Sequence, residues 1–188
     1  LPIAGKPMVQ WTLDAVAGSE QIENIIIIGL GEKHSLNCGA KNVHYIQSGD
    51  TIFDNARSGC RLVLELNPKA TQALWISADL PLIEPPMLDW FINQVGMSIH
   101  DLYYQIIDRN VMESRFPKSR RTYTKLKGKT VCGGDVSAID PNIAANVHPA
   151  FKKISAARKS VMKQASLVGF WPLLLLITQQ MTTTTATK

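Results

Sequence analysis

A run of four consecutive isoleucines at residues 25–28 is the feature that most constrains the fold of this chain. Every residue in the run is apolar and β-branched, so it lacks the polar alternation of a strand with one face in water. We therefore predict a central parallel strand, buried on both faces, that ends at Gly29. A second apolar run at residues 73–78 predicts another strand of the same kind. Such strands need helices on both sides of the sheet, which indicates an α/β fold.

Helical patterns separate these strands. Residues 8–18 repeat apolar side chains at helical spacing, and a short strand at residues 43–46 precedes a helix capped by Asp50 or Thr51. Another helix follows at Pro86. The alternation predicts right-handed βαβ units. We expect a Rossmann-like, three-layer α/β/α architecture with a mostly parallel, twisted sheet.

The second half of the chain differs in composition and in the elements it predicts. A strand is predicted over residues 102–107, and the basic, acid-free segment 114–134 should form a hairpin around residues 127–128. A further strand is predicted over residues 136–139. From Ala150 onward the pattern is helical.

The length of 188 residues, with 45% hydrophobic and 19% charged residues, suits one globular domain with a single core. We predict an α/β domain over residues 1–165. Residues 166–188 should form an apolar helix and a frayed, threonine-rich tail.

The formal charge of +5 favours anionic partners, and both phosphorylated small molecules and nucleic acid have that character. The cysteines form no C-x-x-C pair, and an odd number of them favours a reducing, cytoplasmic setting. The longest apolar run, residues 167–177, is short for a bilayer span and is interrupted by a glycine and a proline. We expect neither a membrane crossing nor a signal peptide. The four histidines lack metal-ligand spacing, and we interpret them and Cys60 as structural.

Asp79 is the first candidate for chemistry, because a buried strand delivers it at the carboxyl end. Ligands of open α/β sheets bind outside the carboxyl ends of the strands. One carboxylate there suits Mg²⁺, which fills its other positions with water and substrate phosphates. A helix cap or turn residue before Pro81 is an equally good interpretation of the spacing alone.

A second candidate is the segment Gly133-Gly134-Asp135, in which paired glycines would let the backbone approach a ligand. Taken by itself, a tight turn with a solvated aspartate is the better interpretation, because Gly-Gly is common at turns.

Basic residues between 118 and 129 form the third candidate. Arg120 and Arg121 suit an anion, since a guanidinium pairs bidentately with phosphate, whereas the lysines fit a solvated hairpin. Arg158 lies on an apolar helical stripe, where it either reaches an anionic site or extends outward to water.

Three segments together resemble the MobA-like nucleotidyltransferases of the glycosyltransferase-A-like superfamily. They are Leu-Pro-Ile-Ala-Gly-Lys-Pro-Met at residues 1–8, Ser-Ala-Asp-Leu-Pro-Leu-Ile at residues 77–83, and Gly-Gly-Asp at residues 133–135 before a β segment. The resemblance spans about residues 1–165, and the D-x-P element is its most specific part.

The resemblance implies Mg²⁺-dependent transfer of an NMP group from an NTP to a phosphorylated small-molecule acceptor, with release of pyrophosphate. The acceptor would be of the molybdenum cofactor or sugar phosphate class. Asp79 matches the catalytic, metal-binding aspartate. The positions that match the nucleotide site are Gly49, Asp50, Thr51, Asn55 and Ser77. The positions assigned to the acceptor are Arg121, Gly133, Gly134, Asp135 and Arg158.

The resemblance also bears on activity. In the family a Gly-rich loop with an arginine and a lysine precedes the segment that matches Leu1, and Lys6 belongs to the following turn instead. We therefore expect weak or no transfer by this polypeptide. Two alternatives stay open: a silent nucleotide-binding protein, and a module that binds nucleic acid through the basic segment. Nucleic acid is the less favoured partner, because few aromatic residues interleave the basic ones.

Overall fold

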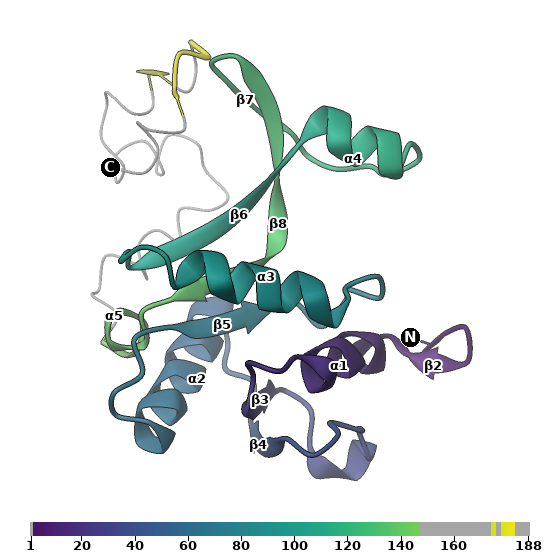
Figure 1. Cartoon of the computed structure of the whole chain (residues 1–188), viewed down its shortest axis with the longest axis vertical. Coiled ribbons are helices and arrows are strands. Elements are labelled where there is room, and N and C mark those ends of the chain that lie inside the picture. The colour runs from purple at the N-terminus through teal and green to yellow at the C-terminus, as the bar shows by residue number, and fades with distance from the viewer. Residues whose placement is uncertain (1, 147–173, 176–177, 183–188) are drawn as a thin grey trace. The chain divides into compact units, whose positions relative to one another are not determined.

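The computed structural model of the chain describes residues 2–146, 174–175 and 178–182 (Figure 1). These residues form two compact units. Unit 1 comprises Leu1–Tyr103 and Asp135–Asn146, and unit 2 comprises Tyr104–Gly134 with the described residues of the C-terminal stretch. The predicted helix from Ala150, Arg158 and the predicted boundary at residue 165 lie outside the described residues.

The elements alternate between strands and helices through most of the chain, as predicted. Those of unit 1 are β1 (Pro2–Ile3), β2 (Lys6–Pro7), α1 (Met8–Gly18), β3 (Asn24–Ile28), η1 (Glu32–His34), β4 (Asn42–Ile46), α2 (Ile52–Leu66), β5 (Ala73–Ile76), α3 (Pro85–Val95) and α5 (Pro141–Ala145). Unit 2 holds α4 (Arg109–Arg115) and β7 (Thr124–Leu126), while the residues of β6 (Leu102–Asp108) and β8 (Lys129–Ile139) are divided between the units.

Strand β3 pairs with β4 in parallel, with Ile25 opposite Val43. This pairing confirms the parallel partner predicted for the isoleucine run. The predicted central position was wrong, because among the described strands β3 and β4 form a two-stranded sheet, in which each is an edge strand. Strand β5 pairs with β8 in the antiparallel sense, with Ile76 opposite Val136, in a sheet of order β5-β8-β6. The predictions of a parallel partner and of a central position for β5 were both wrong, since β5 is the end strand of this order among the described residues. An apolar run shows that a strand is buried on both faces, but the direction of its neighbour depends on how distant chain segments return to it.

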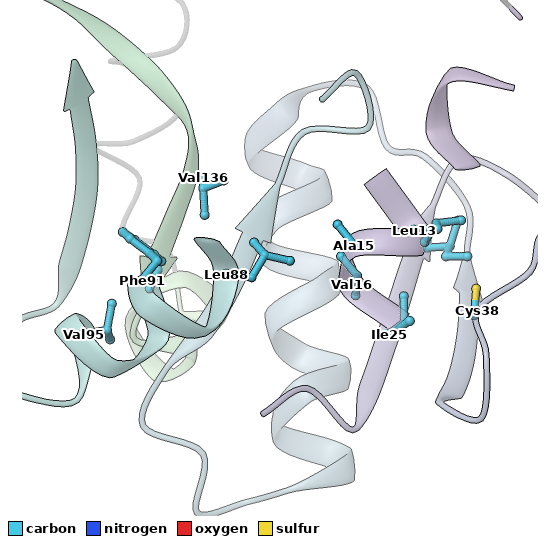
Figure 2. Packing of buried hydrophobic residues seen from close by; sticks show 11 residues of the cluster. Leu13, Ala15, Val16, Ile25, Cys38, Leu88, Phe91, Val95 and Val136 are labelled. Atoms are coloured by element: carbon cyan, nitrogen blue, oxygen red, sulfur yellow. The ribbon is translucent and has the colours of Figure 1, made fainter. Parts of the chain in front are cut away.

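The main core of unit 1 joins α1, α3 and the strands between them. Figure 2 shows Leu13 and Val16 of α1, Ile25 of β3 and Leu88 and Phe91 of α3 in this cluster. Leu88 is only 1% exposed. Close packing of α1 on α3 requires a glycine, because a Cβ on residue 18 would lie 2.7 Å from Cγ of Pro85.

Helix α2 packs beside α5 and contributes to a smaller cluster (Figure 1). The hydroxyl oxygen of Thr51 accepts the Asp54 N–H at 3.1 Å, so Thr51 caps the helix. Cys60 lies in the middle of the helix and is 3% exposed. Among the described residues, no helix has the length and hydropathy needed to cross a bilayer.

In unit 2, β7 and β8 form the predicted hairpin around Gly128, whose φ of +80° favours glycine. Gly133 and Gly134 lie inside strand β8, so the tight turn predicted for them was wrong. Sequence patterns also missed α4, which Asp108 caps by accepting the Asn110 N–H at 2.8 Å.

Candidate nucleotide site

The carboxyl end of β5 places Asp79 in an exposed turn. The Ser77 hydroxyl donates a hydrogen bond to its carboxylate, and the Ser77 N–H donates to the Asp135 carbonyl oxygen at 3.0 Å. Asp79 does not cap the following helix, since Glu84 occupies the N-cap position of α3. Its carboxylate is therefore fixed by a neighbouring side chain and open to a ligand.

The turn that holds Asp79 is anchored to α1. The N–H of Leu80 donates to the Thr12 hydroxyl at 3.2 Å, and Thr12 is only 4% exposed. Buried polar groups are stable where they are hydrogen-bonded, so this bond restrains the turn directly after Asp79. The restraint reduces the conformational entropy that a ligand would have to remove.

The carboxyl ends of β3 and β4 meet in a second pair of turns. Gly29 has a φ of +88°, and its N–H donates to the Ile46 carbonyl at 2.9 Å. A Cβ added to Gly29 would lie 3.4 Å from Cβ of Ser48. Positive φ is accessible to glycine without steric cost, which explains why the isoleucine run ends at this residue.

Asn55 of α2 holds the turn after β4. Its Oδ1 accepts the Gly49 N–H at 2.7 Å, and its amide lies 3.3 Å from the Ser48 hydroxyl. A Cβ on Gly49 would lie 2.7 Å from Cβ of Asp54, so the turn packs too closely on the helix for a larger residue. Gly49 and Asn55, both predicted from the resemblance, are thus joined by a hydrogen bond.

Thr51 and Asp50 lie at the amino end of α2. Thr51 caps the helix, whereas Asp50 is exposed in the preceding turn. Sequence reasoning did not select Arg57, which pairs with Asp54 at 3.3 Å. Its Nε atom is buried without a hydrogen-bond partner among the described residues. The only sequence signal was its position three residues after Asp54, near the start of the helix.

A cleft of about 740 Å³ lies between β3 and β5 within unit 1. Asn55 from α2 and Ser77 from the end of β5 both line it, whereas Asp79 and the other predicted nucleotide residues do not. The structure therefore places on one cleft two residues that are 22 positions apart in the sequence and were both predicted for the nucleotide.

Lys6 is engaged elsewhere in unit 1. Its ammonium group pairs with the Asp14 carboxylate and lies 3.8 Å from the centre of the Trp11 ring. The hydrogen bond from Lys6 lowers the pKa of Asp14. These contacts agree with the assignment of Lys6 to the N-terminal turn and not to a phosphate.

The predicted acceptor residues are divided between the units. Asp135 contributes its backbone to the turn at Ser77 in unit 1, whereas Arg121, Gly133 and Gly134 belong to unit 2. A Cβ on Gly134 would lie 2.9 Å from Cβ of Gln105, so β6 supplies a packing reason for this glycine.

The site offers one carboxylate that could bind a metal, that of Asp79. Among the described residues, no group of three histidine, cysteine or acidic side chains suits a metal. Mg²⁺ needs fewer protein ligands, because it keeps several waters and binds substrate phosphates. The exposed, hydroxyl-supported oxygens of Asp79 fit that ligand chemistry.

Comparison with protein families gives a match over the first part of the chain. The model of the MobA-like NTP transferase domain matches residues 1–113. This range includes Asp79 and all five residues predicted for the nucleotide, whereas the residues predicted for the acceptor follow it. A search of curated protein sequences found no match.

Several solved structures share the fold. A hypothetical transferase from Thermus thermophilus has a TM-score of 0.76 at 24% identity, over 98% of this chain and 74% of that one. CMP:2-keto-3-deoxy-manno-octonic acid synthetase, solved with CTP, has a TM-score of 0.58 at 11% identity, over 93% of this chain and 77% of that one. A 4-diphosphocytidyl-2C-methyl-D-erythritol synthase from Anaerococcus prevotii has a TM-score of 0.58 at 16% identity, over 90% of this chain and 74% of that one. The chain thus has the Rossmann-like α/β fold predicted for it.

Proposed function

Because the chain belongs to the MobA-like NTP transferase domain family, we propose that it transfers an NMP group from an NTP to a phosphorylated small molecule. The acceptor is of the molybdenum cofactor or sugar phosphate class, and pyrophosphate is released. One observation carries the proposal: the Asp79 carboxylate stands exposed at the carboxyl end of β5, supported by the Ser77 hydroxyl.

The nucleotide binds across the turns at the ends of β4 and β5. Gly49, Asp50 and Thr51 approach it at the amino end of α2, where helix N–H groups favour negative charge. Asn55 and Ser77, one beside each turn, line the same cleft of unit 1. The comparison structure solved with CTP supports a nucleoside triphosphate as the ligand class.

The reaction is a displacement at the α-phosphorus. An acceptor phosphate oxygen forms a bond to that atom, and the bond to the bridging oxygen of the leaving pyrophosphate breaks. When bound, Mg²⁺ would neutralise charge that develops on the phosphate oxygens, and Asp79 is the residue that would hold it. The chain contributes mainly by orienting the reactants, and no protein nucleophile is required.

The acceptor is assigned to residues beyond the matched segment. The choice of Asp135 is supported by its backbone hydrogen bond with Ser77, because that bond joins its strand to the residue two positions before Asp79. The other residues of the proposed acceptor set are Arg121, Gly133, Gly134 and Arg158.

We assign the protein to the cytoplasm, since all three cysteines are free thiols in buried positions, as a reducing compartment allows.

The first prediction concerns Asp79. The Asp79→Asn substitution keeps the size of the side chain and removes its charge. We expect Mg²⁺-dependent NTP binding, measured calorimetrically with a panel of NTPs, to weaken at least about tenfold, or roughly 1.4 kcal/mol. Thermal stability without ligand should change little, because the residue is exposed.

Asp140→Asn is the matched control. Asp140 also follows a strand, but it caps α5 by accepting the Asn142 N–H at 2.8 Å. Asparagine caps nearly as well as aspartate, so this variant should bind nucleotide normally. Unaltered Mg²⁺-dependent binding in the Asp79→Asn protein would refute the assignment. Binding without transfer to any phosphorylated acceptor would favour the silent nucleotide-binding alternative.

A further inference from the structure

A pocket of about 330 Å³, here named the hairpin pocket, lies in unit 2 around the tip of the β7–β8 hairpin. Its walls come from the end of β6, the start of α4, both hairpin strands and Gln179 of the C-terminal stretch. That stretch is bonded to the hairpin tip, because the Lys127 N–H donates to the Met181 carbonyl at 2.9 Å (Figure 1). No residue lines both this pocket and the cleft of unit 1.

The hairpin pocket is polar and carries positive charge. Arg109, Lys125 and Lys129 line it, together with one carboxylate, that of Asp108. The Asp108 carboxylate is already used to cap α4. Residues 104–134 as a whole contain eight lysines and arginines and only two acidic residues. Neither lysine of the pocket forms an ion pair with a described residue, so both charges are available to an anion.

Two contacts hold the side chain of Arg109 in place. Its Nε donates to the Glu113 carboxylate at 2.8 Å, and its guanidinium carbon lies 5.2 Å from the centre of the Tyr123 ring. Among the described residues, none accepts a hydrogen bond from its Nη groups. These N–H groups form the planar fork that matches the oxygens of a phosphate. Arg109 therefore presents an oriented donor pair to the pocket.

The hairpin places a second cation on the same side as Arg109. Lys125 stands directly opposite Thr130, and opposite residues of an antiparallel pair share a face. Tyr123 precedes Lys125 by two residues, and alternate side chains of an extended chain also share a face. Because Arg109 covers the Tyr123 ring, its guanidinium lies on the face that carries Lys125 and Thr130. All three of these residues line the pocket.

We propose that the hairpin pocket binds a phosphate group of a small molecule through Arg109, Lys125 and the hydroxyl of Thr130. A guanidinium binds two phosphate oxygens at once, an ammonium group neutralises charge, and a hydroxyl can donate to a further oxygen. Lys129 stands opposite Leu126, on the other face of the hairpin, and contributes only to the local field.

The size of the pocket favours a small anion over a nucleic acid strand. A volume of 330 Å³ corresponds to roughly ten water molecules at about 30 Å³ each, which is enough for a phosphate or a pyrophosphate. The proposal is independent of the transfer reaction, because it does not involve the turn of Asp79.

Titration of the whole chain with inorganic phosphate and with pyrophosphate tests the proposal. EDTA is present throughout, so that Mg²⁺-dependent binding at the turn of Asp79 does not contribute. We expect saturable binding in calorimetry and shifts of the Lys125 and Thr130 amide resonances in NMR spectra. Lys125→Gln should weaken binding at least about fivefold, because a charge-assisted hydrogen bond is lost. Arg109→Lys should also weaken it, since this substitution keeps the charge but removes the planar fork.

Lys127→Gln is the matched control. It removes the same charge from the same hairpin, but residue 127 does not line the pocket, so affinity should change little. Both lysines are exposed, so neither substitution should affect folding. Equal losses of affinity in the Lys125→Gln and Lys127→Gln proteins would show a general effect of the basic segment and overturn the proposal.

Other outcomes would also overturn it. One is the absence of saturable binding by either anion. Another is anion binding that Asp79→Asn abolishes and Lys125→Gln leaves intact, which would place the anion at the proposed nucleotide turn and leave the transfer reaction standing. Binding of single-stranded RNA without binding of phosphate or pyrophosphate would assign the basic residues to nucleic acid and refute the small-molecule site.

Discussion

Asn55 shows how one side chain can hold a binding turn in place. It accepts the Gly49 N–H at 2.7 Å and contacts the Ser48 hydroxyl, so the turn after β4 has its shape before any ligand arrives. Pre-formed turns bind more tightly because less entropy is lost on binding. The contribution of Asn55 to nucleotide affinity should therefore exceed that of a direct contact alone.

The second prediction follows from this bond. Asn55→Ala should lower the free energy of unfolding by about 1 kcal/mol and weaken NTP binding several-fold, because the Gly49 N–H loses its acceptor. Amide exchange at Gly49 should become faster. Calorimetry measures the changes in unfolding and in NTP binding, and hydrogen exchange measures the change at Gly49.

Asn37→Ala is the matched control outside the cleft. Asn37 accepts the Gly39 N–H at 3.0 Å, so the substitution removes the same kind of bond from a residue that does not line the cleft. It should cost similar stability and leave nucleotide affinity unchanged. Equal losses of affinity in the two variants would show that Asn55 acts only through the stability of the fold.

At the scale of elements, strand β6 explains the paired glycines of β8. A Cβ on Gly133 would meet the hydroxyl and ring of Tyr104, whereas a Cβ on Gly134 would lie 2.9 Å from Cβ of Gln105. Tyr104 is an exposed side chain whose ring can move, but Gln105 Cβ is fixed close to the backbone. The two glycines therefore differ in how much they constrain the strand.

The third prediction compares these positions. Gly134→Ala should lower the free energy of unfolding by about 1–3 kcal/mol, as expected for overpacking, and Gly133→Ala should cost less. Gly31→Ala is the control, because its added Cβ meets nothing within 4 Å and its φ of −102° suits alanine. Urea denaturation monitored by circular dichroism measures the free energy of unfolding of each variant and so ranks the three substitutions. Equal effects at positions 133 and 134 would contradict the role assigned to Gln105.

At the scale of the whole molecule, Cys60 links stability to pH. Burial, and then the charge of Asp140, raise the pKa of its thiol to about 11 from an ordinary value of 9.0. The folded protein therefore favours the neutral thiol. Its stabilising contribution is complete below pH 9 and is lost as the pH rises toward about 11, because the unfolded chain ionises first.

The fourth prediction is that the free energy of unfolding falls more steeply with pH in the natural chain than in Cys60→Ala over this range. Two pKa units correspond to roughly 3 kcal/mol at most. Denaturation at a series of pH values, with thiolate absorbance as a direct readout, measures the difference. Parallel pH profiles for the two proteins would exclude Cys60 as the titrating group.

Local sequence patterns were sufficient to predict many elements of this protein and its family. The isoleucine run predicted β3, helical spacing predicted α1, and the hairpin at Gly128 followed from its turn residues. The resemblance of residues 1–8 and 77–83 indicated the family that the match over residues 1–113 shows. These features depend on residues close together in sequence, whose periodicity and turn chemistry act before any distant contact forms.

Tertiary structure alone decided the rest. The antiparallel partner of β5, the neighbours that require Gly133 and Gly134, and the cleft between β3 and β5 each join segments far apart in the chain. Side-chain type specifies burial and local conformation, but the pairing of strand edges depends on which distant backbone groups remain available. For that reason the sequence indicated Asp79 as the centre of a site, while only the fold showed that Asn55 and Ser77 line a common cleft.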